Sequence, residues 1–191
     1  MTNQIQQIIQ ASITTKEKLL SDTIMVQRIE TVVNLVTDAF KQGNRLYFCG
    51  NGGSAADAQH LAAEFSGRFY KNRRALPAEA LHCNTSYLTA VANDYSYDLV
   101  YARLVEGIME KGDVLLGFST SGNSGNIMLA FEAAKRIGVH TIGFTGSGGG
   151  KLKDLSDYLF NIPSDDTPRI QESHIMVGHI ICQLVEEKFF A

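Results

Sequence analysis

Residues 113–137 read DVLLGFSTSGNSGNIMLAFEAAKRI, and this stretch decides the fold that the sequence predicts. The apolar run 113–119 has the length and composition of a buried strand, and 124–137 has the periodicity of a helix. The connection between them is short and rich in serine and glycine. A strand, a short loop and a helix in this order are the repeating unit of a parallel α/β sheet.

The same alternation recurs along the rest of the chain. Further strands are expected at 45–49, 77–81, 139–145 and 157–163. Further helices are expected at 54–66, in pieces within 84–109, and from about 168 to 189. We therefore predict a five-stranded parallel sheet flanked by helices, with a flavodoxin-like arrangement.

Two helical patterns precede the first strand. They lie near 3–20 and 22–42, and Gly43 closes the second. Two apolar-faced helices in this position need a packing partner, and a second subunit is one candidate. The sequence therefore favours an oligomer.

Composition and charge narrow the class of protein. The chain has 191 residues, 45% hydrophobic and 19% charged, which is typical of one globular domain. The net charge of −3 offers no broad basic surface, so no direct nucleic-acid binding is expected. No apolar run approaches the ~18 residues of a membrane span, and the first residues do not resemble a signal peptide. We expect a single domain over 1–191, with N-terminal helices over 1–43 and an α/β core over 44–191.

The cysteines indicate a reducing compartment. Cys49, Cys83 and Cys182 are odd in number, far apart in sequence and form no CxxC pair. This pattern is typical of reduced, buried thiols and not of a disulfide framework. A cytoplasmic protein is expected.

Basic residues cluster in one segment, and two interpretations of it remain open. The cluster is either a solvated loop or a loop with one cation facing an anion. Its members are Arg68, Lys71, Arg73 and Arg74.

Two glycine- and serine-rich turns are expected where ligands bind in such sheets, at the carboxyl ends of strands. They are CGNGGSAADAQH (49–60) and GFSTSGNSGNIM (117–128). Glycines let a ligand approach the backbone, and a helix N-terminus adds free N–H groups and partial positive charge. The hydroxyls of the second turn predict a phosphate site made of Ser119, Thr120, Ser121 and Ser124.

Simpler and rival interpretations of these turns stay open. Ser124 also fits a plain helix cap, with its neighbours as ordinary turn residues, but four hydroxyls in six positions favour the anion site. Neither turn matches a P-loop. Gly50, Gly52 and Ala55 fit G-x-G-x-x-A, but Glu64 comes too early and Glu79 too late for the acidic partner of a dinucleotide site.

Four side chains form a candidate set for metal binding or acid–base chemistry. His60 and Glu64 are spaced i, i+4 and share one helix face, although this is also a common surface pair. Gln171 and His179 differ by about 80° around the last helix, so one side can present both, although His179 also fits an apolar core. Together they suit zinc or proton transfer. Spacing alone does not bring the two helices together.

Five segments of this chain together resemble the phosphoheptose isomerases. The segments are CGNGGSAADAQHLAAEFSGRF (49–69), AVANDYSYD (90–98), GDVLLGFSTSGNSGNI (112–127), TGSGGGKL (145–152) and RIQESHIMVGHI (169–180). The resemblance covers the chain from about residue 40 onward, and the two leading helices fit it as well. Its motifs are long and in order, so it is specific.

The resemblance implies a sugar isomerase (SIS) fold and a homotetramer with sites at subunit interfaces. It implies interconversion of sedoheptulose 7-phosphate and D-glycero-D-manno-heptose 7-phosphate through an enediol, toward the ADP- or GDP-heptose of bacterial surface glycans such as lipopolysaccharide. It implies one zinc ion per subunit, with the ligands His60, Glu64, Gln171 and His179.

Further site residues are implied by the matching positions. The substrate contacts would be Asn51, Gly52, Gly53, Ser54, Glu64, Arg68, Asn93, Asp94, Ser119, Thr120, Ser121, Ser124 and Gln171. Glu64 would act as the base and His179 as its acid partner. Metal binding competes for the same lone pairs, so which group is acid, base or only ligand stays open.

A non-enzymatic relative of the same fold is the alternative. The segments LTAVAND (88–94) and LVYARLVE (99–106) also resemble the SIS-fold protein that binds the replication initiator DnaA. That relative lacks the carboxylate and the second histidine, whereas Glu64 and His179 are both present here, which favours the enzyme. A SIS sugar-phosphate sensor would need a DNA-binding domain, for which this chain has no room.

Overall fold

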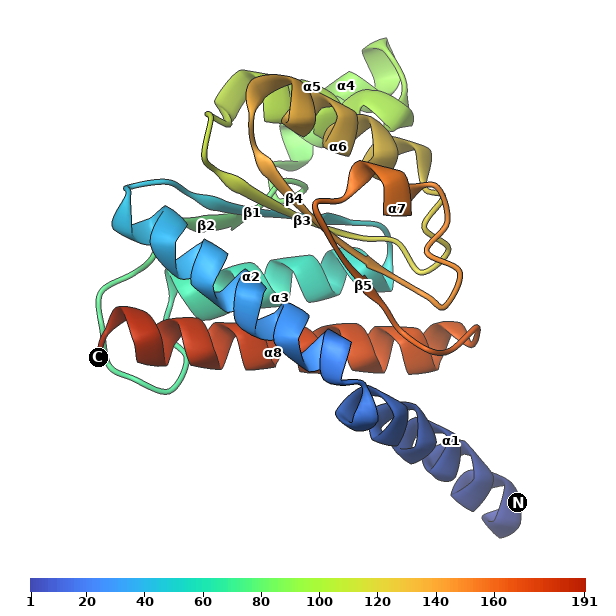
Figure 1. The fold of residues 1–191 in the computed structure, drawn as a ribbon. Coiled ribbons are helices and arrows are strands. Elements are labelled where there is room, and N and C mark those ends of the chain that lie inside the picture. Colours follow the sequence, from blue (N-terminus) through green and yellow to red (C-terminus); the bar gives the residue numbers. More distant parts are fainter.

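The computed structural model describes residues 1–191 and has one sheet of five parallel strands between two layers of helices (Figure 1). The strands are β1 (Leu46–Gly50), β2 (Ala78–Ala80), β3 (Val114–Phe118), β4 (His140–Thr145) and β5 (Tyr158–Asn161). Their order is β2-β1-β3-β4-β5. The predicted five-stranded parallel sheet is confirmed, with strand ends that differ by one or two residues.

The predicted helices are confirmed, and one short helix was not predicted. The long helices are α1 (Thr2–Ser21), α2 (Thr23–Lys41), α3 (Gly53–Ser66), α4 (Thr85–Asp94), α5 (Val100–Ile108), α6 (Gly125–Ile137) and α8 (Thr167–Phe189). A 3-10 turn, η1 (Tyr97–Leu99), separates α4 from α5. The unpredicted helix, α7 (Leu152–Leu155), is one turn long and therefore too short to show a helical period. None of the helices combines the length and apolar character needed to cross a bilayer.

The sheet is buried on both faces, as parallel sheets usually are. Helices α2, α3 and α8 cover one face and α4 to α7 cover the other (Figure 1). Side chains alternate along β1: Leu46 and Phe48 enter the first layer, and Tyr47 and Cys49 enter the second. Strand β3 is buried along its whole length. The core therefore lies in two parts, one on each side of the central strands.

The order in which the strands join the sheet reverses between β1 and β3. The chain goes outward from β1 to β2, returns past β1, and continues through β3, β4 and β5. The two glycine-rich turns follow β1 and β3, so both lie at the switch point where such sheets bind ligands.

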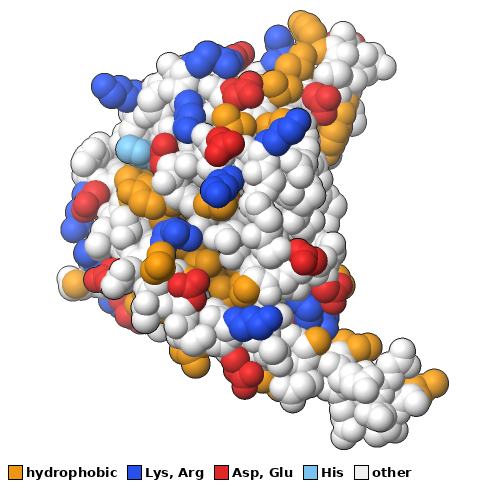
Figure 2. Space-filling view, turned by 45° about the vertical axis from the view of Figure 1, so that its right-hand side comes forward, with side chains coloured by type: hydrophobic (Ala, Val, Ile, Leu, Met, Phe, Trp, Pro, Cys, Tyr) orange, Lys and Arg blue, Asp and Glu red, His pale blue; other side chains and the backbone are white.

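Helix α1 projects away from the body (Figures 1 and 2). The apolar residues Ile5, Ile8, Ile9 and Ile13 of α1 are exposed. Polar contacts tie α1 to α8: Ser12 Oγ donates to Glu172 (2.7 Å), and Arg169 donates to the Ile8 carbonyl (2.9 Å). Helix α2 instead packs one face against α8 and the sheet, although Ile24 and Val26 near its start are exposed.

The surface carries both signs of charge. Figure 2 shows lysine, arginine, aspartate and glutamate side chains interspersed over one face. This distribution agrees with the small net charge of −3.

The cysteine prediction needs one correction. Cys49 and Cys182 are buried and unpaired, but Cys83 is exposed. Cys83 lies in the turn after β2, a three-residue strand at the edge of the sheet. A strand of three residues is too short to show a clear alternation of buried and exposed positions. The sequence therefore does not indicate where the strand ends and the exposed turn begins.

Gly117 lets α6 lie close to the central strand. A Cβ at Gly117 would come 2.8 Å from Cζ of Phe131 and 3.0 Å from Cγ2 of Ile127. We expect Gly117→Ala to destabilise the protein by about 1–3 kcal/mol, because the added methyl overlaps a buried ring. Urea denaturation at one protein concentration measures the effect.

Gly107 is the matched control for this prediction. It lies in α5, where a Cβ would meet no atom within 4 Å. Gly107→Ala should raise stability by about 0.4–1 kcal/mol, because alanine restricts the unfolded chain. Equal effects of the two substitutions would contradict the close packing of α6 on β3.

Candidate active site and metal-ligand group

Helices α3 and α8 lie side by side and run in the same direction. Gly53 at the start of α3 faces Gln171, and Leu61 further along α3 faces Gly178. A Cβ at Gly178 would come 2.8 Å from Cδ2 of Leu61, so the missing side chain lets the helices approach. His60 directly precedes Leu61 in the sequence, and His179 directly follows Gly178.

His60, Glu64 and His179 converge on one point between the two helices. The Nε2 atoms of the two histidines lie 3.0 Å apart, and His60 Nε2 lies 3.1 Å from Glu64 Oε1. All three ligand atoms lie within 4.8 Å of one another. The structure therefore brings together side chains from helices that are more than a hundred residues apart in sequence.

The donor set fits a divalent metal ion. Two ligand atoms bound at 2.0–2.1 Å to a tetrahedral zinc ion lie about 3.3 Å apart, close to the separations at this group. Two imidazole nitrogens and a carboxylate oxygen are also ligand types that zinc accepts. Without an ion, the two Nε2 atoms can share only one hydrogen bond, in which one donates and the other accepts.

The group faces an open groove of about 580 Å³. The groove is lined by His60, Glu64, Phe69, Tyr70, Ile175, Met176, His179, Ile180 and Gln183. The Phe69 ring stacks on the His179 imidazole, with centroids 5.7 Å apart and planes inclined by 22°. The His60 side chain is 54% exposed, so a small molecule can reach this group from solvent.

The surroundings of His179 favour a neutral imidazole. Burial lowers the pKa of His179, and the neighbouring His60 lowers it further, while Glu64 partly offsets both effects. A neutral imidazole is the form that can bind a metal ion, and His179 must take up a proton before it can act as an acid.

Gln171 lies elsewhere on the same pair of helices. Its amide nitrogen would come 2.8 Å from a Cβ at Gly53, so it rests on the first turn of α3. No hydrogen bond joins Gln171 to His60, Glu64 or His179. Three of the four predicted ligands therefore form one group, and the fourth lies against the glycine turn after β1.

The turn after β1 is held by side chains that the sequence did not identify. Asn51 and Asn126 exchange two amide hydrogen bonds of 2.8 and 2.9 Å, and Tyr97 donates its hydroxyl to Asn51 Oδ1 (3.2 Å). Tyr101 donates to the Gly50 carbonyl. The Asn51 side chain, predicted to contact substrate, is thus largely occupied within the protein. The buried Asn126 links the two turns.

The serines of the second turn cluster at the start of α6. Ser119 Oγ and Ser124 Oγ lie 2.9 Å apart, and Ser121 Oγ accepts from the Asn123 N–H (3.1 Å). Ser124 occupies the N-cap position, yet its side chain makes no capping hydrogen bond. Gly122 has φ +67°, and a Cβ there would come 2.6 Å from the carbonyl carbon of Gly149. The turn is therefore built around glycines and leaves N–H groups of α6 free.

The remaining predicted residues surround these turns or lie outside them. Ser54 is buried in the first turn of α3. Asn93 and Asp94 end α4, are exposed, and hydrogen-bond to each other (2.9 Å). Arg68 is exposed just beyond α3 and makes no hydrogen bond or ion pair. Gly52, with φ +56°, is the N-cap of α3.

Asp57 is a titratable residue of this region that the sequence did not single out. It precedes His60 by three residues on α3 and is half-buried, and its Oδ2 is buried without a partner. Burial raises the pKa of Asp57, and the nearby His60 partly opposes that shift. The i, i+3 spacing from His60 was the signal available in the sequence.

His174 belongs to the core, not to the site. It is fully buried, and its Nε2 donates to the Thr145 carbonyl (3.1 Å). Burial lowers the pKa of His174 to about 4, against a smaller opposing effect of that hydrogen bond.

Comparison with known proteins identifies relatives over the full length. Residues 8–146 match the family model of the SIS domain. The chain is 53% identical over 190 residues to the phosphoheptose isomerase of Clostridium acetobutylicum, covering 100% of this chain and 97% of that protein.

Solved structures give the same result. A phosphoheptose isomerase from Neisseria gonorrhoeae superposes with a TM-score of 0.91 at 38% identity, covering 97% of this chain and 98% of that one. A phosphoheptose isomerase from Francisella tularensis superposes with a TM-score of 0.93 at 30% identity, with the same coverage of both chains.

Proposed function

The chain belongs to the SIS-domain family and, within it, to the phosphoheptose isomerases, and we propose that its chemistry takes place at the group formed by His60, Glu64 and His179. It is an aldose–ketose isomerase. The observation that carries the assignment of the site is the convergence of two imidazoles and a carboxylate on one accessible groove. The alternative of a non-catalytic DnaA-binding protein is not supported, because the full-length relatives are named as isomerases.

The proposed substrate is sedoheptulose 7-phosphate, and the product is D-glycero-D-manno-heptose 7-phosphate. This sugar carries its phosphate at C7 and its reacting carbons, C1 and C2, at the other end. The serine turn after β3 would bind the phosphate, and the groove between α3 and α8 would hold C1 and C2. Gly53 and His60 are seven residues apart on α3, a rise of about 10 Å. Helix α3 therefore leads from the glycine turn, which Asn51 and Asn126 join to the serine turn, to the candidate ligands.

The reaction needs a proton moved between neighbouring carbons. Glu64 would take the proton from C1, and the electron pair of that bond would form the double bond of a cis-enediol while O2 gains a proton from His179. Return of a proton to C2, with loss of the proton on O1, gives the aldose. Glu64 Oε1 faces His60, which leaves Oε2 for proton transfer.

A zinc ion, one per subunit, is the proposed cofactor. Its ligands would be His60, Glu64, His179 and Gln171, the last after its side chain turns away from Gly53. Such an ion supplies Lewis-acid polarisation of the substrate carbonyl. His179 Nε2 cannot bind the metal and carry a proton at the same time, so its two proposed roles exclude each other within one step.

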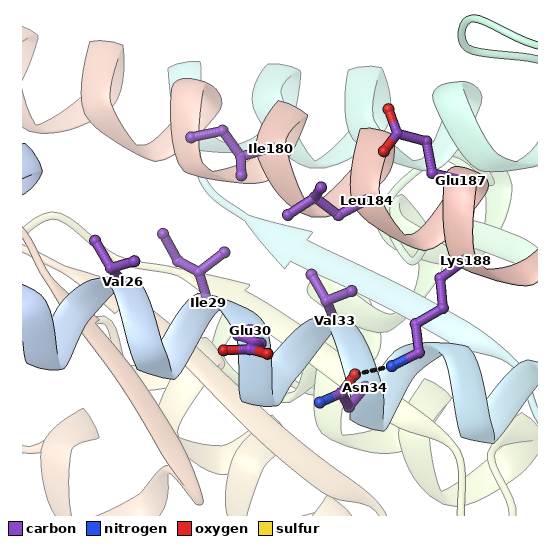
Figure 3. Close-up of a pocket in the computed structure, with 9 residues that line it drawn as sticks. All are labelled: Val26, Ile29, Glu30, Val33, Asn34, Ile180, Leu184, Glu187 and Lys188. Atoms are coloured by element: carbon purple, nitrogen blue, oxygen red, sulfur yellow. Dashed lines mark hydrogen bonds between the residues drawn. The ribbon is translucent and has the colours of Figure 1, made fainter.

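The proposed assembly is a homotetramer. Two apolar surfaces remain uncovered in a single chain: the stripe on α1 and a groove of about 670 Å³ between α2 and α8 (Figure 3). The groove has an apolar floor and a polar rim, and it is lined by Val26, Ile29, Glu30, Val33, Asn34, Ile180, Leu184, Glu187 and Lys188. Surfaces of this kind support contact between copies of the chain.

The proposed location is the cytoplasm, where heptose 7-phosphate would feed the synthesis of nucleotide-activated heptose for surface glycans such as lipopolysaccharide. The three cysteines form no disulfide, which agrees with a reducing compartment.

Substitutions separate proton transfer from metal binding when activity is measured in excess zinc. Under that condition Glu64→Gln and His179→Gln should each still lower kcat for aldose formation from sedoheptulose 7-phosphate by at least ~100-fold, the scale of lost acid–base catalysis. His60→Gln is the control, because His60 is proposed only as a ligand. Its activity should recover with excess zinc and fall with chelator. Unchanged turnover of either of the first two variants would contradict the assignment.

The phosphate site has a separate test. Ser119→Ala and Ser124→Ala should each weaken binding of inorganic phosphate and raise KM by roughly 10–100-fold, because each removes a hydrogen bond to a charged group. Isothermal titration measures the phosphate affinity. Ser156→Ala is the control, because Ser156 donates to the Leu152 carbonyl away from this turn. Phosphate affinity equal to that of the wild type would locate the anion elsewhere.

The assembly is tested at the groove between α2 and α8. Leu184, 38% exposed, lines this groove, and Leu184→Asp should produce smaller species in light scattering because a buried charge opposes association. Ile108→Asp is the matched control, since Ile108 is 40% exposed on α5, across the sheet. A variant Leu184→Asp with the mass of the wild type would exclude this groove as an interface.

A further inference from the structure

A buried carboxylate on α8 organises the segment that follows α3. Glu186 is 1% exposed and accepts four hydrogen bonds. Its Oε1 accepts from the Phe69 N–H (3.1 Å) and Arg73 Nε (2.7 Å), and its Oε2 accepts from the N–H groups of Tyr70 and Lys71 (2.8 Å each). Burial alone would raise the pKa of Glu186, but these hydrogen bonds outweigh it and lower the pKa. The carboxylate is therefore charged and fully paired.

Arg73, the partner of Glu186, holds the end of α3. Its side chain is 3% exposed. Nη2 donates to the Glu64 carbonyl (2.7 Å), and Nη1 donates to the carbonyls of Phe65 (2.8 Å) and Gly67 (3.1 Å). These carbonyls lack partners within the helix, and a cation at a helix C-terminus is favourable. Arg73 thus fixes the backbone of the turn that carries Glu64.

The segment held by Glu186 forms one wall of the groove. Residues 67–76 contain no helix or strand, so their path depends on these contacts. Phe69 and Tyr70, whose N–H groups bind Glu186, both line the groove. The Phe69 ring stacks on His179. One carboxylate therefore controls the position of the ring that rests on a proposed metal ligand.

We propose that Glu186 and Arg73 are positioning residues for the group formed by His60, Glu64 and His179. Arg73 orients Glu64 through its backbone, and Glu186 orients His179 through the ring of Phe69. Neither residue touches the substrate. The effect on catalysis rests on the proposed function. The effect on the orientation of His179 does not, because that orientation can be measured whatever reaction the site performs.

The alternative is a purely structural ion pair that closes the loop after α3. Such a pair would change stability when broken and would leave the histidines in place. The two possibilities differ in what happens to the His179 imidazole in protein that remains folded.

The test compares Glu186→Gln, Phe69→Leu and the control Glu132→Gln. Glu132 lies on α6, across the sheet from α8, is exposed, and its side chain makes no hydrogen bond or ion pair. In metal-free protein, imidazole ¹⁵N–¹H signals should shift for His179 in the first two variants and stay unchanged in the control. Zinc affinity, measured by competition with a chelator, should fall about 10–100-fold in those two variants, the usual effect of losing an outer partner of a metal ligand. Their kcat should fall while KM stays unchanged.

Folded Glu186→Gln protein with His179 signals and zinc affinity of the wild type overturns the proposal. If Glu186→Gln does not fold by circular dichroism, Phe69→Leu decides, because it keeps the ion pair and removes only the ring. Zinc affinity of the wild type in Phe69→Leu then overturns the proposal, because loss of the Phe69 ring current shifts the His179 signals whatever the orientation of the imidazole. A wild-type protein without zinc binding or isomerase activity contradicts the proposed function instead, since the imidazole signals report orientation without either.

Discussion

The close approach of α3 to α8 at Gly178 is the contact on which the site depends. Leu61 occupies the space that a side chain at position 178 would fill. Because the two helices run in the same direction, the residues next to this contact, His60 and His179, also meet. Glu64 lies one turn further along α3 and completes the group. A larger residue at 178 would separate the helices and therefore the candidate ligands His60, Glu64 and His179, without touching any of them.

The sheet and the helix pair supply different parts of the site. The switch point between β1 and β3 brings two glycine-rich turns together, and the reciprocal amide pair of Asn51 and Asn126 fixes one against the other. These turns offer N–H groups and hydroxyls, which suit an anion. The helix pair offers imidazole and carboxylate, which suit a metal ion and proton transfer. The glycine turn begins α3, so this helix connects the two parts.

Much of this arrangement could be predicted from the sequence, because it follows from local patterns. The run 113–119 and its serine-rich turn predict a strand, a loop and a helix, and the i, i+4 spacing of His60 and Glu64 places both on one face. Contacts between residues that are far apart in the sequence leave no such local pattern. Asn126 looks like any polar residue at a helix start. The four basic residues after α3 fit either a solvated loop or a loop with one cation facing an anion, and the sequence does not indicate which cation or which anion. In the structure, one of these four, Arg73, is buried and paired with Glu186 across the fold.

Helix α8 contributes residues both to the candidate site and to the apolar groove between α2 and α8. His179 belongs to the candidate metal-ligand group, and Glu186 holds the loop that forms one wall of the groove beside it. Ile180 lines both this groove and the groove between α2 and α8. In a single chain the groove beside His60 stays open to water. An enediol is better protected, and charges act more strongly, where water is excluded. A partner that covers Ile180, where the two grooves meet, would therefore also change the exposure of the candidate ligands to water. The proposed assembly would therefore act on the proposed site through neighbouring residues of one helix.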